Sequence, residues 1–427
     1  MLAKRVNSKC EGEISFYPLF QYAFLALPLG FSGFPIYILA PDFYALNYQI
    51  TLSSLGIALL FIRMIDAFQD PLIGVISDRY RSHIFFIMCV SSFILTLSIY
   101  SLFNATLFTP LIRFVIFMTL SVSAYSILTI NLNTVGGLWL RDETSQTKIS
   151  AMREFFALIG LLIAVSAPTL FERLVQKNQV YTSFTFMLLV LIIFGLIGFY
   201  KWYAKYSKKL QVPIKPNIFK MNSLCSSTKK FYGIYLISMF ASSIPAVLVI
   251  FFVRDLLGVG SYTGVFLILY FISAAIFIPF WNHTSQKVGK YRAWLMSMLL
   301  ASLTFVWAFF LNKGDVWQYG VICFISGSAL GGDLVFPPSI VAEQVHASKS
   351  QSYASSYYSI LTLLSKASLA FASALSFFIL DYAEFKVGGS NLRENLLGLS
   401  VAYALVPCLL KLISAFMLWK CFIKYQR

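Results

Sequence analysis

The stretch FIRMIDAFQDPLIGVISDRYRSH, residues 61–83, sets the interpretation of the whole chain. It begins inside a long apolar run, in which Arg63, Asp66 and Asp70 follow one another at spacings of three and four residues. On an α-helix these spacings place the three side chains on one face. Because an ionised side chain that faces lipid is costly, we expect this face to contact protein or water.

Pro71 directly follows the second aspartate. A proline has no N–H, so the carbonyl of Ala67 loses its usual helical partner. The stretch therefore combines two carboxylates with a free carbonyl oxygen. Oxygen-only groups of this kind suit a small hard cation such as Na⁺, or a proton, which predicts a site for a co-transported cation and no other cofactor.

The composition is that of a membrane protein. The chain has 427 residues, of which 59% are hydrophobic and only 12% charged, and its mean hydropathy is +0.77. Apolar runs repeatedly reach the roughly 20 residues that cross a bilayer. We therefore predict an all-α membrane protein with twelve transmembrane helices. The expected spans are residues 16–40, 52–77, 84–103, 109–133, 150–171, 181–203, 232–253, 262–281, 292–311, 318–341, 354–381 and 397–420.

The net charge of +16 is explained by membrane topology better than by nucleic-acid binding. Basic residues concentrate in the loops on the N-terminal side of the bilayer, and the link between spans 6 and 7 carries eight lysines and no acid: Lys201, Lys205, Lys208, Lys209, Lys215, Lys220, Lys229 and Lys230. This positive-inside bias places both termini in the cytoplasm. We expect a multi-pass protein of the inner (cytoplasmic) membrane, with the lipid bilayer, a small solute and a cation as partners.

The chain divides into two similar halves. We predict an N-terminal six-helix bundle over residues 1–203, a cytoplasmic Lys-rich linker over 204–230 and a C-terminal six-helix bundle over 231–427. Pro71 and Pro279 are 208 residues apart, as two repeats related along the membrane normal require. At the same offset Phe271, Ala274 and Ile278 replace the three charged residues of span 2, so the repeated fold does not need the charges.

Polar residues in other spans are candidates for binding the solute. Span 4 contributes Tyr125, Thr129, Asn131 and Asn133, span 5 Arg153, span 10 Asp333, and span 11 Thr362 with Lys366 one turn later. The hydroxyl and amide groups could equally satisfy one another between helices. Arg153 and Glu154 are adjacent in sequence, so we expect them not to face each other. Lys411 in span 12 also needs a partner, and the sequence names none.

Span 2 ends in Gly74 followed by Asp78, Arg79 and Arg81. Gly74 would permit close helix contact, and the charges would reach the cytoplasmic surface. The spacing resembles the signature between helices 2 and 3 of the major facilitator superfamily. We interpret it as a gating latch in which a salt-bridged cluster holds one face shut, although these charges could also be the solvated end of a helix.

Longer stretches resemble one family within that superfamily. RMIDAFQDPLIG at 63–74 and LTLLSKASLAF at 361–371 resemble the melibiose permease-like glycoside–pentoside–hexuronide:cation symporters. VRDLLG at 253–258 and GGDLVFPPSIVAE at 331–343 resemble a bacterial branch of the same superfamily. The resemblance implies that Asp66 and Asp70 form the cation site, with Arg63 and Lys366 close by.

The same resemblance implies that Arg153 lies on the substrate side. The sugar-gripping acids of the family are missing, because Leu29 or Gly30 stands near one of their positions and Thr129 near the other. A galactoside substrate is therefore disfavoured. Relatives that carry lysolipids make an amphiphile the alternative to a sugar-type solute.

Our leading hypothesis is cation-coupled symport by alternating access, in which the empty carboxylates Asp66 and Asp70 repel each other until a cation binds. The alternative is a structural network in which Arg63 and Lys366 neutralise both acids without any ion. We do not expect an enzyme, since no metal-ligand or nucleophile motif occurs at membrane depth. The six cysteines likewise form no metal spacing or disulfide framework.

Overall fold

The computed structural model describes residues 15–34, 36, 39–48, 50, 52–104, 108–176, 179–210, 224–385 and 392–424. These ranges form helices joined by short connections, and no strand occurs within them. The predicted all-α membrane fold is therefore confirmed.

The N-terminal half contains eight helices in the described ranges. They are α1 (Phe16–Ala23), α2 (Ala26–Phe34), α3 (Ala40–Tyr48), α4 (Leu52–Arg79), α5 (Ile84–Asn104), α6 (Pro110–Trp139), α7 (Glu143–Leu174) and α8 (Val180–Leu210).

The C-terminal half contains seven α-helices in the described ranges, several of them extended by short 3₁₀ or π segments. The helices are α9 (Ser226–Phe251), α10 (Thr263–Val288), α11 (Lys290–Phe305), α12 (Val316–Ala347), α13 (Ala354–Tyr382), α14 (Arg393–Ser400) and α15 (Val406–Leu418). The short segments that matter below are η8 (Gln351–Tyr353), η9 (Val401–Leu405) and η10 (Trp419–Ile423).

Ten helices of the described part are long and apolar enough to cross a membrane. The predicted spans 16–40 and 52–77 are not among them. The first is broken, because α1 ends at Ala23 and α2 starts at Ala26. The second is α4, whose 28 residues span about 42 Å at 1.5 Å per residue, enough for a bilayer core of about 30 Å.

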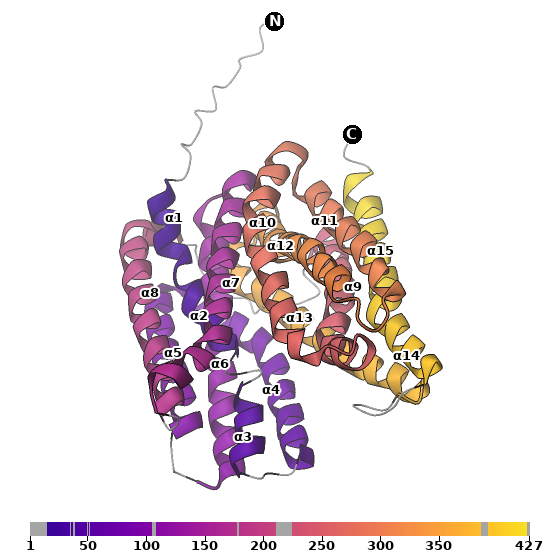
Figure 1. Ribbon diagram of the computed structural model, residues 1–427. Helices are drawn as coiled ribbons and strands as arrows, with labels where there is room; N and C mark the ends of the chain where they lie inside the picture. The colour runs from indigo at the N-terminus through magenta and orange to yellow at the C-terminus, as the bar shows by residue number, and fades with distance from the viewer. Residues whose placement is uncertain are drawn as a thin grey trace, which may run out of the picture.

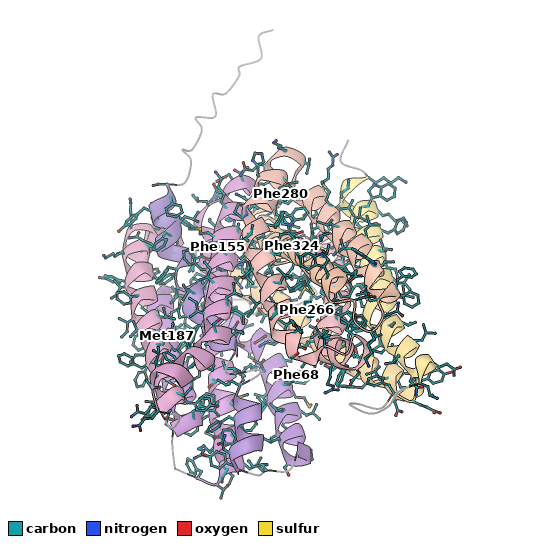
Figure 2. All side chains as sticks on the ribbon, in the orientation of Figure 1. Phe68, Phe155, Met187, Phe266, Phe280 and Phe324 are labelled. Atoms are coloured by element: carbon teal, nitrogen blue, oxygen red, sulfur yellow. The ribbon has the colours of Figure 1, made fainter. Side chains whose placement is uncertain are left out.

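Apolar side chains cover the outside of the helices (Figure 2), as a lipid solvent requires. Phe68 on α4 is 71% exposed and Phe280 on α10 is 51% exposed. The interior contains small residues that let helices approach closely. A Cβ at Gly160 of α7, for example, would lie 2.0 Å from the carbonyl oxygen of Leu27 in α2.

The two halves meet along five helix pairs. α4 packs against α13, α7 against α10 and α12, and α6 against both α12 and α13. In Figure 1, α1 begins and η10 ends at the upper end of the molecule, where α10, α11 and α12 also have termini. The predicted linker 204–230 is helical at both ends, since α8 continues to Leu210 and α9 starts at Ser226. Residues 211–223 lie outside the described ranges.

Candidate functional site: a charged cluster between the two halves

Helix α4 presents its two acids toward the C-terminal half. Asp66 and Asp70 are one turn apart, and their exposed fractions are only 4% and 0%. Lys366 approaches them from α13, so one side chain of the C-terminal half closes a cluster begun in the N-terminal half. Residues 300 positions apart in the sequence therefore form a single buried site.

The Lys366 ammonium lies between the two carboxylates. Its Nζ is 2.6 Å from Oδ1 of Asp66, and 2.9 Å and 2.8 Å from Oδ1 and Oδ2 of Asp70. It also donates to the carbonyl of Asp66 at 3.1 Å and to the Ser126 hydroxyl of α6 at 2.8 Å. The sequence pointed to the carbonyl of Ala67, whereas the carbonyl that Lys366 reaches is that of Asp66.

Polar groups of α4 and α6 extend the cluster on the Asp66 side. The Ser126 hydroxyl donates to Oδ1 of Asp66 at 3.1 Å, and Nε2 of Gln69 donates to the same oxygen at 3.1 Å. Gln69 in turn accepts a hydrogen bond from Ser123 at 2.7 Å. Asp66 is thus held by several donors, while Asp70 depends mainly on Lys366.

Arg63 does not join this cluster. Its side chain is exposed and makes no ion pair with the residues that the structure describes. Two carboxylates and one ammonium therefore share the buried volume, which leaves one uncompensated negative charge when all three groups are ionised. By its spacing, Arg63 lies about one turn before Asp66, toward the N-terminal end of α4.

Helix α6 carries buried polar atoms without hydrogen-bond partners in the two turns after Ser126. Tyr125, Thr129 and Asn133 are spaced by four residues and are all half-buried. Within the described part, Oγ1 of Thr129 and Oδ1 of Asn131 and Asn133 are buried without a hydrogen-bond partner. The amide nitrogen of Asn131 donates to the carbonyl of Ile127 at 2.8 Å. Buried polar atoms without partners are exceptional, so this face is able to accept hydrogen bonds from a ligand.

Arg153 and Glu154 of α7 form an ion pair, contrary to our expectation that adjacent residues would not meet. Nη2 of Arg153 lies 2.7 Å from Oε1 of Glu154. The long arginine side chain bends back along the helix surface, a freedom that backbone spacing does not describe. Glu154 keeps an exposed fraction of 21% and lies within electrostatic reach of Tyr125 on α6 and Tyr235 on α9.

The remaining predicted solute residues form no hydrogen bond or ion pair with the cluster in the described part of the chain. The Thr362 hydroxyl donates to the carbonyl of Tyr358 at 3.0 Å, within its own helix. Asp333 of α12 is ion-paired with Lys411 of α15, whose partner we could not predict from the sequence. Nε1 of Trp294 on α11 also donates to Asp333, at 2.9 Å. This second charged pair belongs wholly to the C-terminal half.

Three of the four residues predicted to form a gate (Gly74, Asp78 and Arg81) lie where α4 and the short turn after it meet η8 and α13. A Cβ at Gly74 would lie 2.3 Å from Oγ of Ser359, so only glycine allows this approach. Asp78 accepts hydrogen bonds from the backbone N–H groups of Ser355 and Ser356, both at 2.8 Å, and from the Ser356 hydroxyl at 2.6 Å. It thereby caps the N-terminus of α13 from the opposite half.

Arg81 completes this contact. It pairs with Asp78 and donates to the carbonyls of Gln351 and Ser352 in η8, at 2.5 and 3.2 Å. Arg79 is exposed and makes no hydrogen bond with the described residues. Other contacts join the halves at this end, including His346 Nε2 with the carbonyl of Gly137 at 2.8 Å.

The described residues contain no group of three or more His, Cys, Asp or Glu side chains able to hold a metal.

The family model described as MFS/sugar transport protein matches residues 20–427, nearly the whole chain. The protein is a member of this family. It is therefore a membrane transporter of the major facilitator superfamily (MFS), not an enzyme.

Solved structures support the same fold for this MFS transporter. A bacterial homologue of the iron transporter ferroportin, in an outward-facing state, gives a TM-score of 0.72 at 13% identity, covering 95% of this chain and 99% of that chain. The MFS transporter FucP, the E. coli fucose:proton symporter, in the outward conformation gives 0.70 at 11% identity, covering 95% and 99%. The human organic anion transporter MFSD10 (TETRAN) gives 0.64 at 14% identity, covering 94% and 99%. Among curated proteins, none matches the chain significantly.

Sequence reasoning missed several contacts within the transporter's polar sites. Ser123 and Gln69 extend the charged cluster, and Trp294 and Lys411 bind Asp333. Gln69 carried a usable signal, because it lies next to Asp70 and three residues after Asp66 in the deciding stretch. Trp294 carried none, since an indole in an apolar span is usually only a packing residue.

Proposed function

We propose that this MFS transporter moves a small solute together with Na⁺ or H⁺ by alternating access, with the cation bound at the Asp66–Asp70–Lys366 cluster. The observation that carries the proposal is the charge of this cluster, two carboxylates against one ammonium in a buried site. A lone buried charge is strongly disfavoured, so the site gains stability by taking up a proton or a cation.

The competing interpretation, a purely structural salt-bridge network, required Arg63 as the second cation. With Arg63 outside the cluster, the two negative charges of Asp66 and Asp70 face only the one positive charge of Lys366. Lys366 does link α4 to α13, so the cluster also holds the halves together. The cluster can both bind the cation and hold the halves together. A cation that competes with Lys366 for a carboxylate weakens the link between the halves.

Asp70 is the carboxylate better suited to take the proton. It is fully buried and depends mainly on Lys366, whereas Asp66 also accepts from Ser126 and Gln69. Protonation of Asp70 would leave Asp66 and Lys366 as a neutral pair. A bound Na⁺ could instead use the carboxylate oxygens with the Ser126 hydroxyl, all of them hard oxygen ligands.

Alternating access requires that the halves separate at one end while they close at the other. The Asp78 and Arg81 contacts close the end that bears the start of α1 and the end of η10. If the termini are cytoplasmic, as the positive-inside bias predicts, this closed end faces the cytoplasm. The conformation is then outward-facing, the state named for the ferroportin homologue and for FucP. The inner membrane is the expected location.

The solute is expected to bind beside the cluster, against the unsatisfied polar face of α6. Hydroxyl and amide groups of Thr129 and Asn133 suit a neutral polar solute such as a sugar, in keeping with the resemblance to melibiose permease-like symporters. An amphiphile is the alternative. It is favoured by an apolar groove between α9 and α13, lined by Phe240, Phe371 and Phe378 among others.

The test uses the purified transporter in proteoliposomes. Labelled mono- and disaccharides and a lysolipid are offered with an imposed Na⁺ gradient, a pH gradient or neither. We expect one gradient to drive accumulation in the wild type, and this drive to disappear in Asp66→Asn and Asp70→Asn while solute exchange without a gradient survives in Asp70→Asn.

Asp255→Asn serves as the matched control, because Asp255 is also ion-paired, with Arg254 at 2.7 Å, but lies away from the cluster. It should accumulate solute like the wild type. Gradient dependence that is unchanged in both cluster variants would overturn the coupling proposal. Uptake of lysolipid but of no sugar would decide for the amphiphile.

A further inference from the structure

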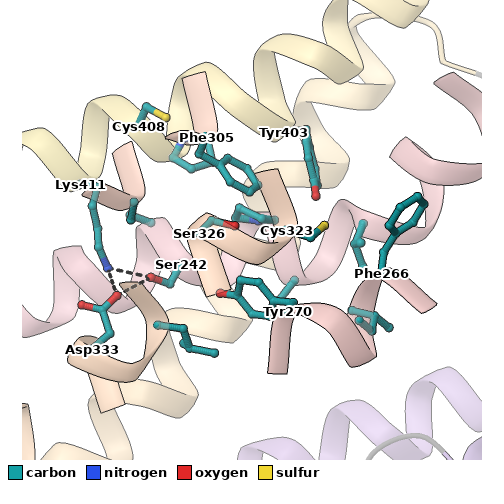
Figure 3. A pocket seen from close by; sticks show the side chains of 18 of the residues that line it. Ser242, Phe266, Tyr270, Phe305, Cys323, Ser326, Asp333, Tyr403, Cys408 and Lys411 are labelled. Carbon is teal, nitrogen blue, oxygen red and sulfur yellow. Dashed lines mark hydrogen bonds and ion pairs between the residues drawn. The ribbon is translucent and has the colours of Figure 1, made fainter. Parts of the chain in front are cut away.

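The C-terminal half contains a partly open cavity of its own, of about 370 Å³. Its wall is formed by α9, α10, α11, α12, η9 and α15, without any residue of the N-terminal half (Figure 3). The cavity is therefore separate from the Asp66–Asp70–Lys366 cluster. Its volume falls at the small end of the range of roughly 300–1,000 Å³ that is typical of ligand pockets.

One end of the cavity is polar. Asp333 and Lys411 pair there, and the Lys411 ammonium also binds the hydroxyls of Ser242 at 2.8 Å and Ser238 at 2.9 Å. The other carboxylate oxygen of Asp333 accepts from Nε1 of Trp294 at 2.9 Å. Because the two charges cancel and each has several partners, this end does not require an ionic ligand.

The opposite end is apolar and aromatic. Phe266, Phe305, Tyr319 and Tyr403 line it, and the hydroxyls of the two tyrosines are 2.6 Å apart and satisfy each other. A charged group placed here would lose its hydration without a counter-ion. An aromatic ring would instead replace empty volume with dispersion contacts.

Tyr270 lies between the two ends with an unused hydroxyl. Figure 3 shows its ring across the cavity from Ser326, with the hydroxyl directed inward on the side of Asp333. This hydroxyl has no hydrogen-bond partner among the residues that the structure describes. A hydroxyl can both donate and accept, so it can bind a single neutral polar group of a ligand.

From these features we propose that the cavity binds a small uncharged aromatic molecule that carries one hydroxyl group, with its ring against Phe266, Phe305 and Tyr403 and its hydroxyl on Tyr270. This site does not depend on the proposed coupling function, since the two share no residue. Occupancy links α10, α11 and η9 and so raises the stability of the C-terminal half.

The experiment measures binding of 4-methylphenol to the full chain in lipid nanodiscs, with toluene and 4-methylbenzoate as matched probes. Thermal shift and equilibrium dialysis are both recorded at pH 7. We expect 4-methylphenol to bind about tenfold more tightly than toluene, which lacks the hydroxyl, and than 4-methylbenzoate, which is charged.

Two variants locate the site. Ser326→Phe fills the cavity and should abolish binding of 4-methylphenol, while Tyr270→Phe should remove its advantage over toluene. Ser166→Phe on α7 is the matched control, because Ser166 and Ser326 each donate to a carbonyl four residues earlier but only Ser326 lines the cavity. The control should bind like the wild type.

Equal binding of 4-methylphenol and toluene by the wild type overturns the proposal, as does tighter binding of 4-methylbenzoate. Unchanged binding in both Ser326→Phe and Tyr270→Phe also overturns it. If Ser326→Phe does not fold, Tyr270→Phe decides, because it removes one oxygen and keeps the ring. Gradient-driven transport, measured with the same variants in proteoliposomes, reports separately on the coupling proposal.

Discussion

The replacement Lys366→Met tests the charge balance of the cluster most directly. The substitution removes the ammonium that lies 2.6 Å from Asp66 and 2.8 Å from Asp70 and keeps a side chain of similar length. Two buried carboxylates then have no cation. Breaking a buried ion pair by removing one partner costs about 3–5 kcal/mol, so we expect the free energy of unfolding to fall by that amount.

A second substitution gives the expected rescue. In the double variant Lys366→Met/Asp70→Asn one carboxylate remains, and Asp66 still accepts from Ser126 and Gln69. We expect the double variant to regain about 2 kcal/mol or more of the loss, because the unpaired charge of Asp70 is gone. The free energies come from reversible unfolding in mixed detergent micelles, compared around the mutant cycle.

The control cycle combines Lys366→Met with Asp255→Asn, which removes a carboxylate outside the cluster. It should show no rescue. A loss of less than about 1 kcal/mol in Lys366→Met would contradict a buried, charge-paired lysine. Equal rescue by Asp255→Asn and Asp70→Asn would show that the effect is not local to the cluster.

Three further outcomes follow from the gate and from one helix cap. Asp78→Ala removes three hydrogen bonds to the N-terminus of α13 and leaves Arg81 without its carboxylate, so we expect a cysteine placed at Ser355 to become reactive to a water-soluble maleimide; unchanged labelling would contradict a closed gate. Gly74→Ala should lower stability by about 1–3 kcal/mol and separate α4 from α13, measured by thermal melting and by cross-linking between them, and wild-type values in both would refute the close contact. Asp142 is exposed at the start of α7 and accepts from the Ser145 N–H at 2.8 Å; burial raises its pKa, but the hydrogen bonds from Ser145 and Thr144 outweigh this and hold it below its usual value. Since a lowered pKa stabilises the folded state above the unfolded pKa of about 3.9, Asp142→Ala should cost about 1 kcal/mol at pH 7 and progressively less as the pH falls below about 4, and a difference that does not depend on pH would exclude this cap.

The sequence was sufficient for the fold class, which follows from the long apolar runs, and for placing Asp66 and Asp70 on one helix face, which follows from their spacing. The sequence also predicted that Gly74 permits a close helix contact, and the structure places that contact between α4 and α13. Sequence reasoning failed where the outcome depends on how helices rotate against one another. Lys411 and Asp333 lie on different helices, and in spans that are apolar on every side periodicity does not show which faces meet.

Side-chain reach was the other limit. Arg63 shares a helical face with both aspartates, yet a shared face does not ensure contact when another cation, Lys366, already lies between the carboxylates. Arg153 and Glu154 show the reverse case, in which adjacent residues met because a long side chain can fold back. The proline and glycine residues of span 1 (Pro28, Gly30, Gly33 and Pro35) indicate a bent helix, but they do not show that it breaks between Ala23 and Ala26.

The position of Lys366 has a consequence for leakage. The lysine belongs to one bundle and its carboxylate partners to the other, and along α13 it lies ten residues from Ser356, about 15 Å from the gate. Under the proposed coupling, an empty carrier keeps this bridge intact and resists reorientation. Solute without the cation would then cross slowly, because the bridge that the cation weakens still holds the two halves together.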